Sequence, residues 1–223
     1  MTRRRLAVAA AVLLVLAGTL GWVVFYSSAL GLEHIEVRGA QSLSAAAVEE
    51  VLAIPEGTPL VRVDLSAAEA ALENITQIES ANLTRDWPRT LVVQLTERSA
   101  VAAVDVGGTI WLLDRFGVLF AQVSAVPEGV LSLRAATPGP DDRATSAAIE
   151  VIQALTPAIS AILVQVLAAS PTEIELELTD GRTVIWGGPD NSVRKSQILA
   201  GLLAGGVVGT VYDVSSPTSA VVR

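Results

Sequence analysis

The sequence predicts an α+β protein built from a single N-terminal transmembrane helix, a small β-α-α-β-β domain and a mixed β domain with flanking helices. Three observations lead to this fold class. An uncharged run precedes the first acidic residues, helical and strand-like patterns then alternate, and short apolar runs separated by turn residues follow. We therefore expect a cytoplasmic tail over residues 1–5, a signal anchor over 6–28, and domains over 32–99 and 100–223.

The uncharged run reads "LAVAAAVLLVLAGTLGWVVFY" from Leu6 to Tyr26. A helix of this length rises about 30 Å, enough to cross the hydrocarbon core of a bilayer. Three arginines (residues 3–5) precede it, so the positive-inside bias predicts a single-pass type II protein with its body outside the cytoplasm. Trp22 and Tyr26 fall near the outer interface, which aromatic side chains favour. The small residues 27–29 leave a cleavable signal peptide as an alternative, and cleavage would also export the body.

Residues 32–99 contain the patterns of three strands and two helices. The segment "EHIEVRG" predicts a short strand that ends at Gly39, and "SLSAAAVEEVLAI" predicts a helix behind Ser42 or Ser44 as N-cap. A second helix is expected near Asp64, with Ser66 and Glu69 spaced as a capping box. The segments "IESANLTRDW" and "RTLVVQLTER" then predict two strands joined at Trp87-Pro88.

Residues 100–223 are rich in strand patterns. A helix is expected over residues 145–155, and "TEIELELTDGRTVIW" predicts a hairpin around an Asp180-Gly181 turn. A helix capped near Asp190 and a strand in "GTVYDV" follow. After Asp213 the tail "VSSPTSAVVR" has no charged residue until Arg223. Exposed sheet edges normally carry charges that prevent pairing, so this apolar tail predicts an edge meant to be paired.

Composition and charge exclude several classes of function. Beyond residue 5 the chain has 12 basic and 23 acidic residues, so clustered phosphate contacts to nucleic acid are not expected. The chain has no Cys and one His, which argues against thiolate chemistry and against cofactor or metal sites. Glu173, Glu175 and Glu177 alternate along one strand, which we interpret as a solvated, edge-protecting row. No catalytic motif or small-molecule site emerges, and we expect an exported, non-enzymatic interaction protein, with an exported cell-wall enzyme or a secreted binding module as alternatives.

Specific runs resemble the FtsQ/DivIB family of bacterial cell division proteins over nearly the whole chain. One is "IEVRGAQSLSAAAVEEVLAIPEGTPLVRVDLSAAEAAL", and another is "ANLTRDWPRTLVVQLTERSAVA", in which Ala100 stands where the family often has Pro. "LLDRFGVLF" and "YDVSSPTSAVVR" are similar to a later family motif and to its closing strand. The positions that carry the first domain's motif are Gly39, Arg85, Trp87, Pro88, Glu97 and Arg98.

The resemblance implies a POTRA domain followed by an FtsQ-type β domain, in a divisome scaffold at the cytoplasmic membrane of the division septum. Such a scaffold links early and late division proteins, and it binds FtsB and FtsL through the last strand of the β domain to help control septal peptidoglycan synthesis. It needs no cofactor, nucleic acid or small-molecule substrate. Carried onto this chain, the partner-binding positions are Val211, Tyr212, Asp213, Val214, Ser219, Ala220, Val221, Val222 and Arg223.

Overall fold

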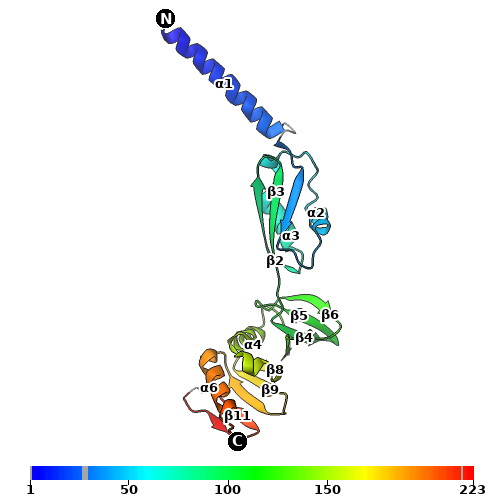
Figure 1. Cartoon of the computed structure of the whole chain (residues 1–223), viewed down its shortest axis with the longest axis vertical. Coiled ribbons are helices and arrows are strands. Elements are labelled where there is room, and N and C mark those ends of the chain that lie inside the picture. Colours follow the sequence, from blue (N-terminus) through cyan, green and yellow to red (C-terminus); the bar gives the residue numbers. More distant parts are fainter. Residues whose placement is uncertain (1, 27–29, 217) are drawn as a thin grey trace. The chain divides into compact units, whose positions relative to one another are not determined.

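The computed structural model describes residues 2–26, 30–216 and 218–223, and it divides into two compact units (Figure 1). The first unit ends at Glu97 and the second begins at Arg98. The small residues 27–29, which suggested a cleavage site, lie outside the described residues.

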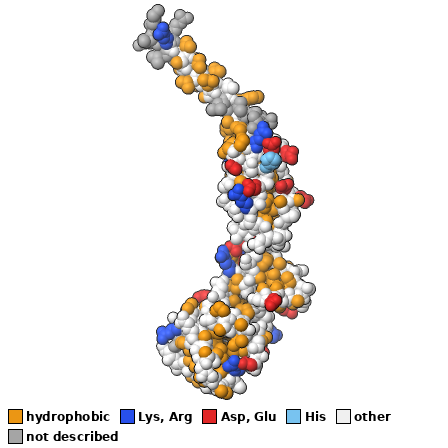
Figure 2. Space-filling model, viewed as in Figure 1, with side chains coloured by type: hydrophobic (Ala, Val, Ile, Leu, Met, Phe, Trp, Pro, Cys, Tyr) orange, Lys and Arg blue, Asp and Glu red, His pale blue; other side chains and the backbone are white. Residues whose placement is uncertain are grey.

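The chain begins with helix α1 (Thr2–Tyr26). Its described side chains are mostly hydrophobic and exposed, Trp22 among them (Figure 2). The side chains of Leu6 and Tyr26 lie outside the description. Within the part of the chain that the structure describes, no helix combines the length and the apolar character that crossing a membrane requires.

The rest of the first unit packs two helices on a three-stranded sheet, as predicted. Its elements are β1 (His34–Arg38), α2 (Ala45–Leu52), the 3-10 turn η2 (Leu60–Arg62), α3 (Leu65–Glu73), β2 (Ile78–Asp86) and β3 (Thr90–Glu97). The sheet order is β1-β3-β2, with β1 parallel and β2 antiparallel to β3. Val48 from α2, Leu72 from α3 and Leu91 from β3 are buried in one apolar core. Burial of these faces, more than the propensity of such short helices, stabilises the unit.

The caps of the two helices differ in part from the predicted ones. Ser44 caps α2, because its side chain accepts a hydrogen bond from the Ala47 N–H. Asp64 itself caps α3 in the same way, so the predicted capping box of Ser66 and Glu69 is not formed. Glu69 instead accepts a hydrogen bond of 2.7 Å from the Leu83 N–H of β2. A tertiary contact has therefore replaced the local one.

The second unit is one nine-stranded mixed sheet with helices. Its order is β12-β11-β10-β9-β8-β7-β4-β5-β6. The strands are β4 (Ala102–Val106), β5 (Thr109–Leu113), β6 (Leu119–Val123), β7 (Leu131–Ala135), β8 (Leu163–Ser170), β9 (Glu173–Leu178), β10 (Thr183–Gly187), β11 (Val211–Asp213) and β12 (Val221–Val222). The helices are α4 (Arg143–Ala154), α5 (Pro157–Ser160) and α6 (Ser192–Ala204). Val151 of α4 and Leu199 of α6 share one core with Leu176 of β9, so these helices cover one face of the sheet.

The predicted hairpin around Asp180 and Gly181 is present as β9 and β10. Its three glutamates are exposed, as expected, but their strand is not an edge: β9 lies between β8 and β10. The interpretation of an edge-protecting row is therefore wrong. The three carboxylates project from the interior of the sheet, on the face opposite α4 and α6, which keeps that face soluble.

Candidate partner-binding edge

The tail folds back onto the sheet and forms its outermost described strand. β12 pairs antiparallel with β11, with Val222 opposite Tyr212 and Val221 opposite Asp213. β11 is held on its other side by β10, to which it runs parallel. The prediction treated residues 211–214 and 219–223 as one docking edge, but the structure separates them. Of these two strands, only β12 has an open side, since β11 lies between β10 and β12.

The hydrogen bonds between β11 and β12 decide which backbone groups face outward. Val211 and Arg223 exchange both bonds, with N···O distances of 3.0 Å from Val211 and 2.9 Å from Arg223. In an antiparallel ladder such pairs alternate with pairs that exchange none. The N–H and C=O of Val222 therefore point away from β11, toward the open side of the sheet. These two groups are available to a further strand.

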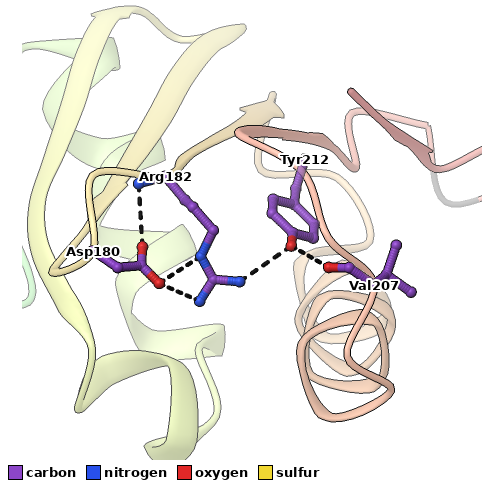
Figure 3. Close-up of polar contacts among 4 residues, drawn as sticks. All are labelled: Asp180, Arg182, Val207 and Tyr212. Carbon is purple, nitrogen blue, oxygen red and sulfur yellow. Dashed lines mark hydrogen bonds and ion pairs between the residues drawn. The ribbon is translucent and has the colours of Figure 1, made fainter.

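The side chain of Tyr212 is not available to a partner, because it is fully buried. Figure 3 shows its hydroxyl between two partners. It accepts a hydrogen bond of 3.1 Å from Nη1 of Arg182 and donates one of 2.5 Å to the carbonyl oxygen of Val207. The Arg182 guanidinium carbon also lies 5.4 Å from the centre of the Tyr212 ring, within the range of a cation–π contact. Tyr212 thus positions neighbouring segments instead of contacting solvent.

Arg182 is in turn held by Asp180, across the β9–β10 turn (Figure 3). Its Nε and Nη2 lie 2.6 Å and 2.5 Å from Oδ2 of Asp180. The hydrogen bond from Arg182 lowers the pKa of the Asp180 carboxyl. The network therefore ties the β9–β10 turn, β11 and the loop after α6 together.

The other predicted tail residues have distinct environments. Asp213 accepts hydrogen bonds from the hydroxyl and the N–H of Ser215, at 2.7 Å and 3.0 Å. The bond from the Ser215 hydroxyl is the main reason why the pKa of the Asp213 carboxyl is lowered. Val214 is buried, and its N–H donates to the Ile185 carbonyl of β10. The Ser219 N–H closes a turn with Ser216, while Ala220, Val221 and Arg223 are exposed. The exposed backbone and side chains are thus concentrated in the tail.

A buried lysine supports the end of β10 beside this edge. Nζ of Lys195, on α6, donates hydrogen bonds of 3.0 Å and 2.8 Å to the carbonyl oxygens of Trp186 and Gly188. Burial lowers the pKa of this ammonium group. Gly187, between the two carbonyls, has φ +75°, and a Cβ there would lie 3.0 Å from Cβ of Ser215. Lys195 therefore fixes the backbone against which the segment after β11 packs.

The motif residues of the first unit are structural. Gly39 has φ +81°, and a side chain there would collide with the Leu95 carbonyl. Glu97 accepts hydrogen bonds from the N–H groups of residues 41–43 and from the Ser42 hydroxyl, so it holds the loop before α2. Arg85 donates two bonds of 2.6 Å to the carbonyls of Leu60 and Val63, which ties η2 to the sheet.

Trp87 and Pro88 form the turn between β2 and β3, joined by a cis peptide bond, and the Trp87 side chain is half exposed. Arg98 belongs to the second unit, where it pairs with the fully buried Asp114. Asp114 also accepts hydrogen bonds of 2.8 Å from the N–H groups of Phe116 and Val118. These contacts shape the β5–β6 turn, in agreement with a role in folding.

Within residues 2–26, 30–216 and 218–223, no three His, Asp or Glu side chains gather closely enough to hold a metal ion. Sequence reasoning missed the supporting roles of Arg182 and Lys195. The composition could have drawn attention to Lys195, because it is the only lysine in the sequence.

Comparison with known proteins agrees with this architecture. A family model described as a POTRA domain of the FtsQ type matches residues 30–98, and one described as the C-terminal part of cell division protein FtsQ/DivIB matches residues 102–211. A cell division protein FtsQ from Streptomyces collinus is 36% identical over 97% of this chain and 86% of its own length. The chain belongs to the FtsQ/DivIB family of cell division proteins. The resemblance in the sequence and the α+β architecture are thereby confirmed.

Other relatives carry the same description. FtsQ from Mycolicibacterium smegmatis is 38% identical over 93% of the chain, and FtsQ from Streptomyces coelicolor is 34% identical over 97%. The chain spans 62% of the length of the Mycolicibacterium protein and 86% of the Streptomyces coelicolor protein. In family terms, the first unit contains the POTRA domain and the second the FtsQ/DivIB C-terminal domain.

Proposed function

We propose that this protein is a non-enzymatic scaffold of the divisome whose β domain binds FtsB- and FtsL-type division proteins at the outer side of β12. The observation that carries this proposal is the outward-facing N–H and C=O of Val222 on a strand with no charged side chain. Strand addition supplies affinity through such main-chain groups. Natural sheets often use charged side chains at an edge to prevent pairing, and between Asp213 and Arg223 this segment has none.

The position of the protein in the cell is part of the proposal. Residues 6–26 contain no charged side chain and follow three arginines, which favours a membrane anchor with a cytoplasmic N-terminus and an extracytoplasmic body at the septum. Within that body, we assign the POTRA domain to residues 32–99 and the β domain to residues 100–223. In this arrangement, the scaffold would link early and late division proteins and influence septal peptidoglycan synthesis.

The decisive experiment is reconstitution with the natural partners. The full chain, purified in detergent micelles, is mixed with the purified FtsB- and FtsL-type pair of the same organism, and complex formation is followed by size-exclusion chromatography and isothermal titration. We expect a stable complex that a proline at Val222 weakens. Absence of binding by the unmodified chain would overturn the proposed function, and turnover of purified peptidoglycan by the chain would overturn its non-enzymatic character.

A further inference from the structure

The loop between α6 and β11 presents two adjacent valines to solvent. Val208 is 95% exposed and Val207 is 41% exposed. Single exposed apolar side chains are common and need no explanation. These two, however, lie on a loop whose backbone is fixed: Val207 accepts the 2.5 Å hydrogen bond from Tyr212, and its N–H donates to Leu202 at 3.3 Å (Figure 3). The buried side chain of Tyr212 thus holds an exposed apolar loop in one position.

This loop lies against the end of β12. A Cβ on Gly209 would collide with Cγ1 of Val222 and would lie 2.7 Å from the carbonyl oxygen of Arg223. That carbonyl also accepts hydrogen bonds from the N–H groups of Thr210 and Val211, at 2.6 Å and 3.0 Å. The loop that carries the two exposed valines therefore contacts β12, the strand at the open side of the sheet.

The register of the sheet shows which side chain of an added strand would reach the loop. Val184, Tyr212 and Val222 lie opposite one another on β10, β11 and β12. Directly paired residues point to the same face of a sheet. This row faces the core, since Val184 and Tyr212 are fully buried and Val222 packs against the same cluster. The next member of the row would be the partner residue opposite Val222, on the same face as the Val222 side chain that Gly209 of this loop approaches.

We propose that the Val207–Val208 loop is a second contact for the partner strand and selects an apolar side chain opposite Val222. The occupant is an extended segment of the division partner, and this inference rests on the proposed function. Edge hydrogen bonds alone do not distinguish one sequence from another, because every residue except proline offers the same main-chain groups. An apolar residue at one defined position supplies that discrimination, since burying it with Val208 removes apolar surface from water.

The test uses the full chain in detergent micelles and the same purified FtsB- and FtsL-type pair. Val208→Asp is compared with Val193→Asp, because Val193 is an equally apolar residue, 63% exposed, on α6. We expect Val208→Asp to weaken binding about tenfold or more and Val193→Asp to leave it within about twofold, which correspond to about 1.4 and 0.4 kcal/mol. Val208→Ile, which retains an apolar surface, should bind like the unmodified chain. Equal thermal unfolding midpoints for the variants establish that folding is unchanged.

The outcomes separate this inference from the function on which it rests. Unchanged binding by Val208→Asp, together with weakened binding by Val222→Pro, would overturn the second contact and leave strand addition standing. Equal loss of affinity in Val208→Asp and Val193→Asp would also overturn it, because the effect would then be that of added charge. If the unmodified chain does not bind the pair, both the function and this inference fail.

Discussion

The hydroxyl of Tyr212 donates a 2.5 Å hydrogen bond to the carbonyl oxygen of Val207, five residues earlier in the chain. The same hydroxyl accepts from Arg182, so one phenol links the β9–β10 turn to the loop after α6. The sequence offers Tyr212 as an apparent binding residue of an exposed strand. Its actual place in the core shows that β11 is held by internal polar contacts as well as by its ladders with β10 and β12.

Replacing Tyr212 by Phe tests this link. The change retains the ring and removes the only group that satisfies both Val207 and Arg182 in this network, and we expect a loss of about 1–2 kcal/mol in the free energy of unfolding. Urea denaturation measures it, and amide hydrogen exchange over residues 207–211 should become faster. Asp180→Asn is the comparison: it removes the charge of the partly exposed ion pair with Arg182, which contributes about 0–1 kcal/mol, and leaves both hydrogen-bonding groups of the Tyr212 hydroxyl in place. A stability loss for Tyr212→Phe below that of Asp180→Asn would contradict the linking role.

The fold was predictable where local patterns and burial agree. The first unit follows from alternating apolar residues in two strands and from apolar stripes on two helices, and the β9–β10 hairpin follows from Asp180-Gly181 between alternating segments. The order of the nine-stranded sheet did not follow, because parallel neighbours such as β7 and β8 are far apart in the sequence.

The candidate site was predictable in outline only. An apolar tail without charges indicated pairing, and β12 does pair, but with β11 of the same chain. Sequence patterns could not assign the interior position of Glu175, nor the burial of Lys195, because both depend on which strands and helices become neighbours. Tertiary contacts likewise decided that Glu69 contacts β2 and does not cap its own helix.

Glu97 gives the first unit a pH-dependent element of stability. Burial alone would raise the pKa of its carboxyl, but hydrogen bonds from the Ser42 hydroxyl and from three backbone N–H groups outweigh it and lower the pKa to about 2. A carboxyl whose folded pKa lies below its unfolded value stabilises the protein above the unfolded pKa, here 4.5, and loses this contribution as the pH falls toward about 2.

We therefore expect Glu97→Gln to reduce stability at pH 7 and to have a smaller effect near pH 3. Urea denaturation at both values measures this difference. Glu50→Gln is the matched control, because Glu50 lies on α2 with an exposed side chain for which the described contacts include no hydrogen bond. A stability change for Glu97→Gln that is the same at both pH values would show that the carboxylate charge is not what holds the loop at Ser42.

Lys195 should be a sensitive position of α6, because its buried ammonium group holds two backbone carbonyls. Lys195→Met retains the apolar stem but leaves the carbonyls of Trp186 and Gly188 without their donor, so we expect a loss of about 2 kcal/mol. Arg194→Met, one residue earlier and exposed, should change stability by less than about 0.5 kcal/mol. Chemical denaturation compares the two. Equal stability of Lys195→Met and the unmodified chain would contradict the supporting role assigned to this lysine.

A pair of prolines distinguishes addition of a partner strand outside β12 from replacement of β12. Val222→Pro removes an N–H that faces the open edge and leaves the bonds of Arg223 with Val211 in place. Val221→Pro removes an N–H that, by the alternation of the ladder, faces β11, so it should detach the tail. Hydrogen exchange at the Val211 N–H, which donates to Arg223, reports whether the tail stays bound.

If a partner adds outside β12, both prolines weaken its binding by about tenfold or more. Val222→Pro interrupts the ladder between β12 and the partner, and Val221→Pro detaches the strand on which that ladder forms. Only Val221→Pro should then expose Val211 to exchange. If a partner instead replaces β12, detaching the tail opens β11, and Val221→Pro would bind more tightly than the unmodified chain. Titration of each variant with the FtsB- and FtsL-type pair gives the answer, and our expectation is that Val222→Pro loses affinity while Val211 remains protected.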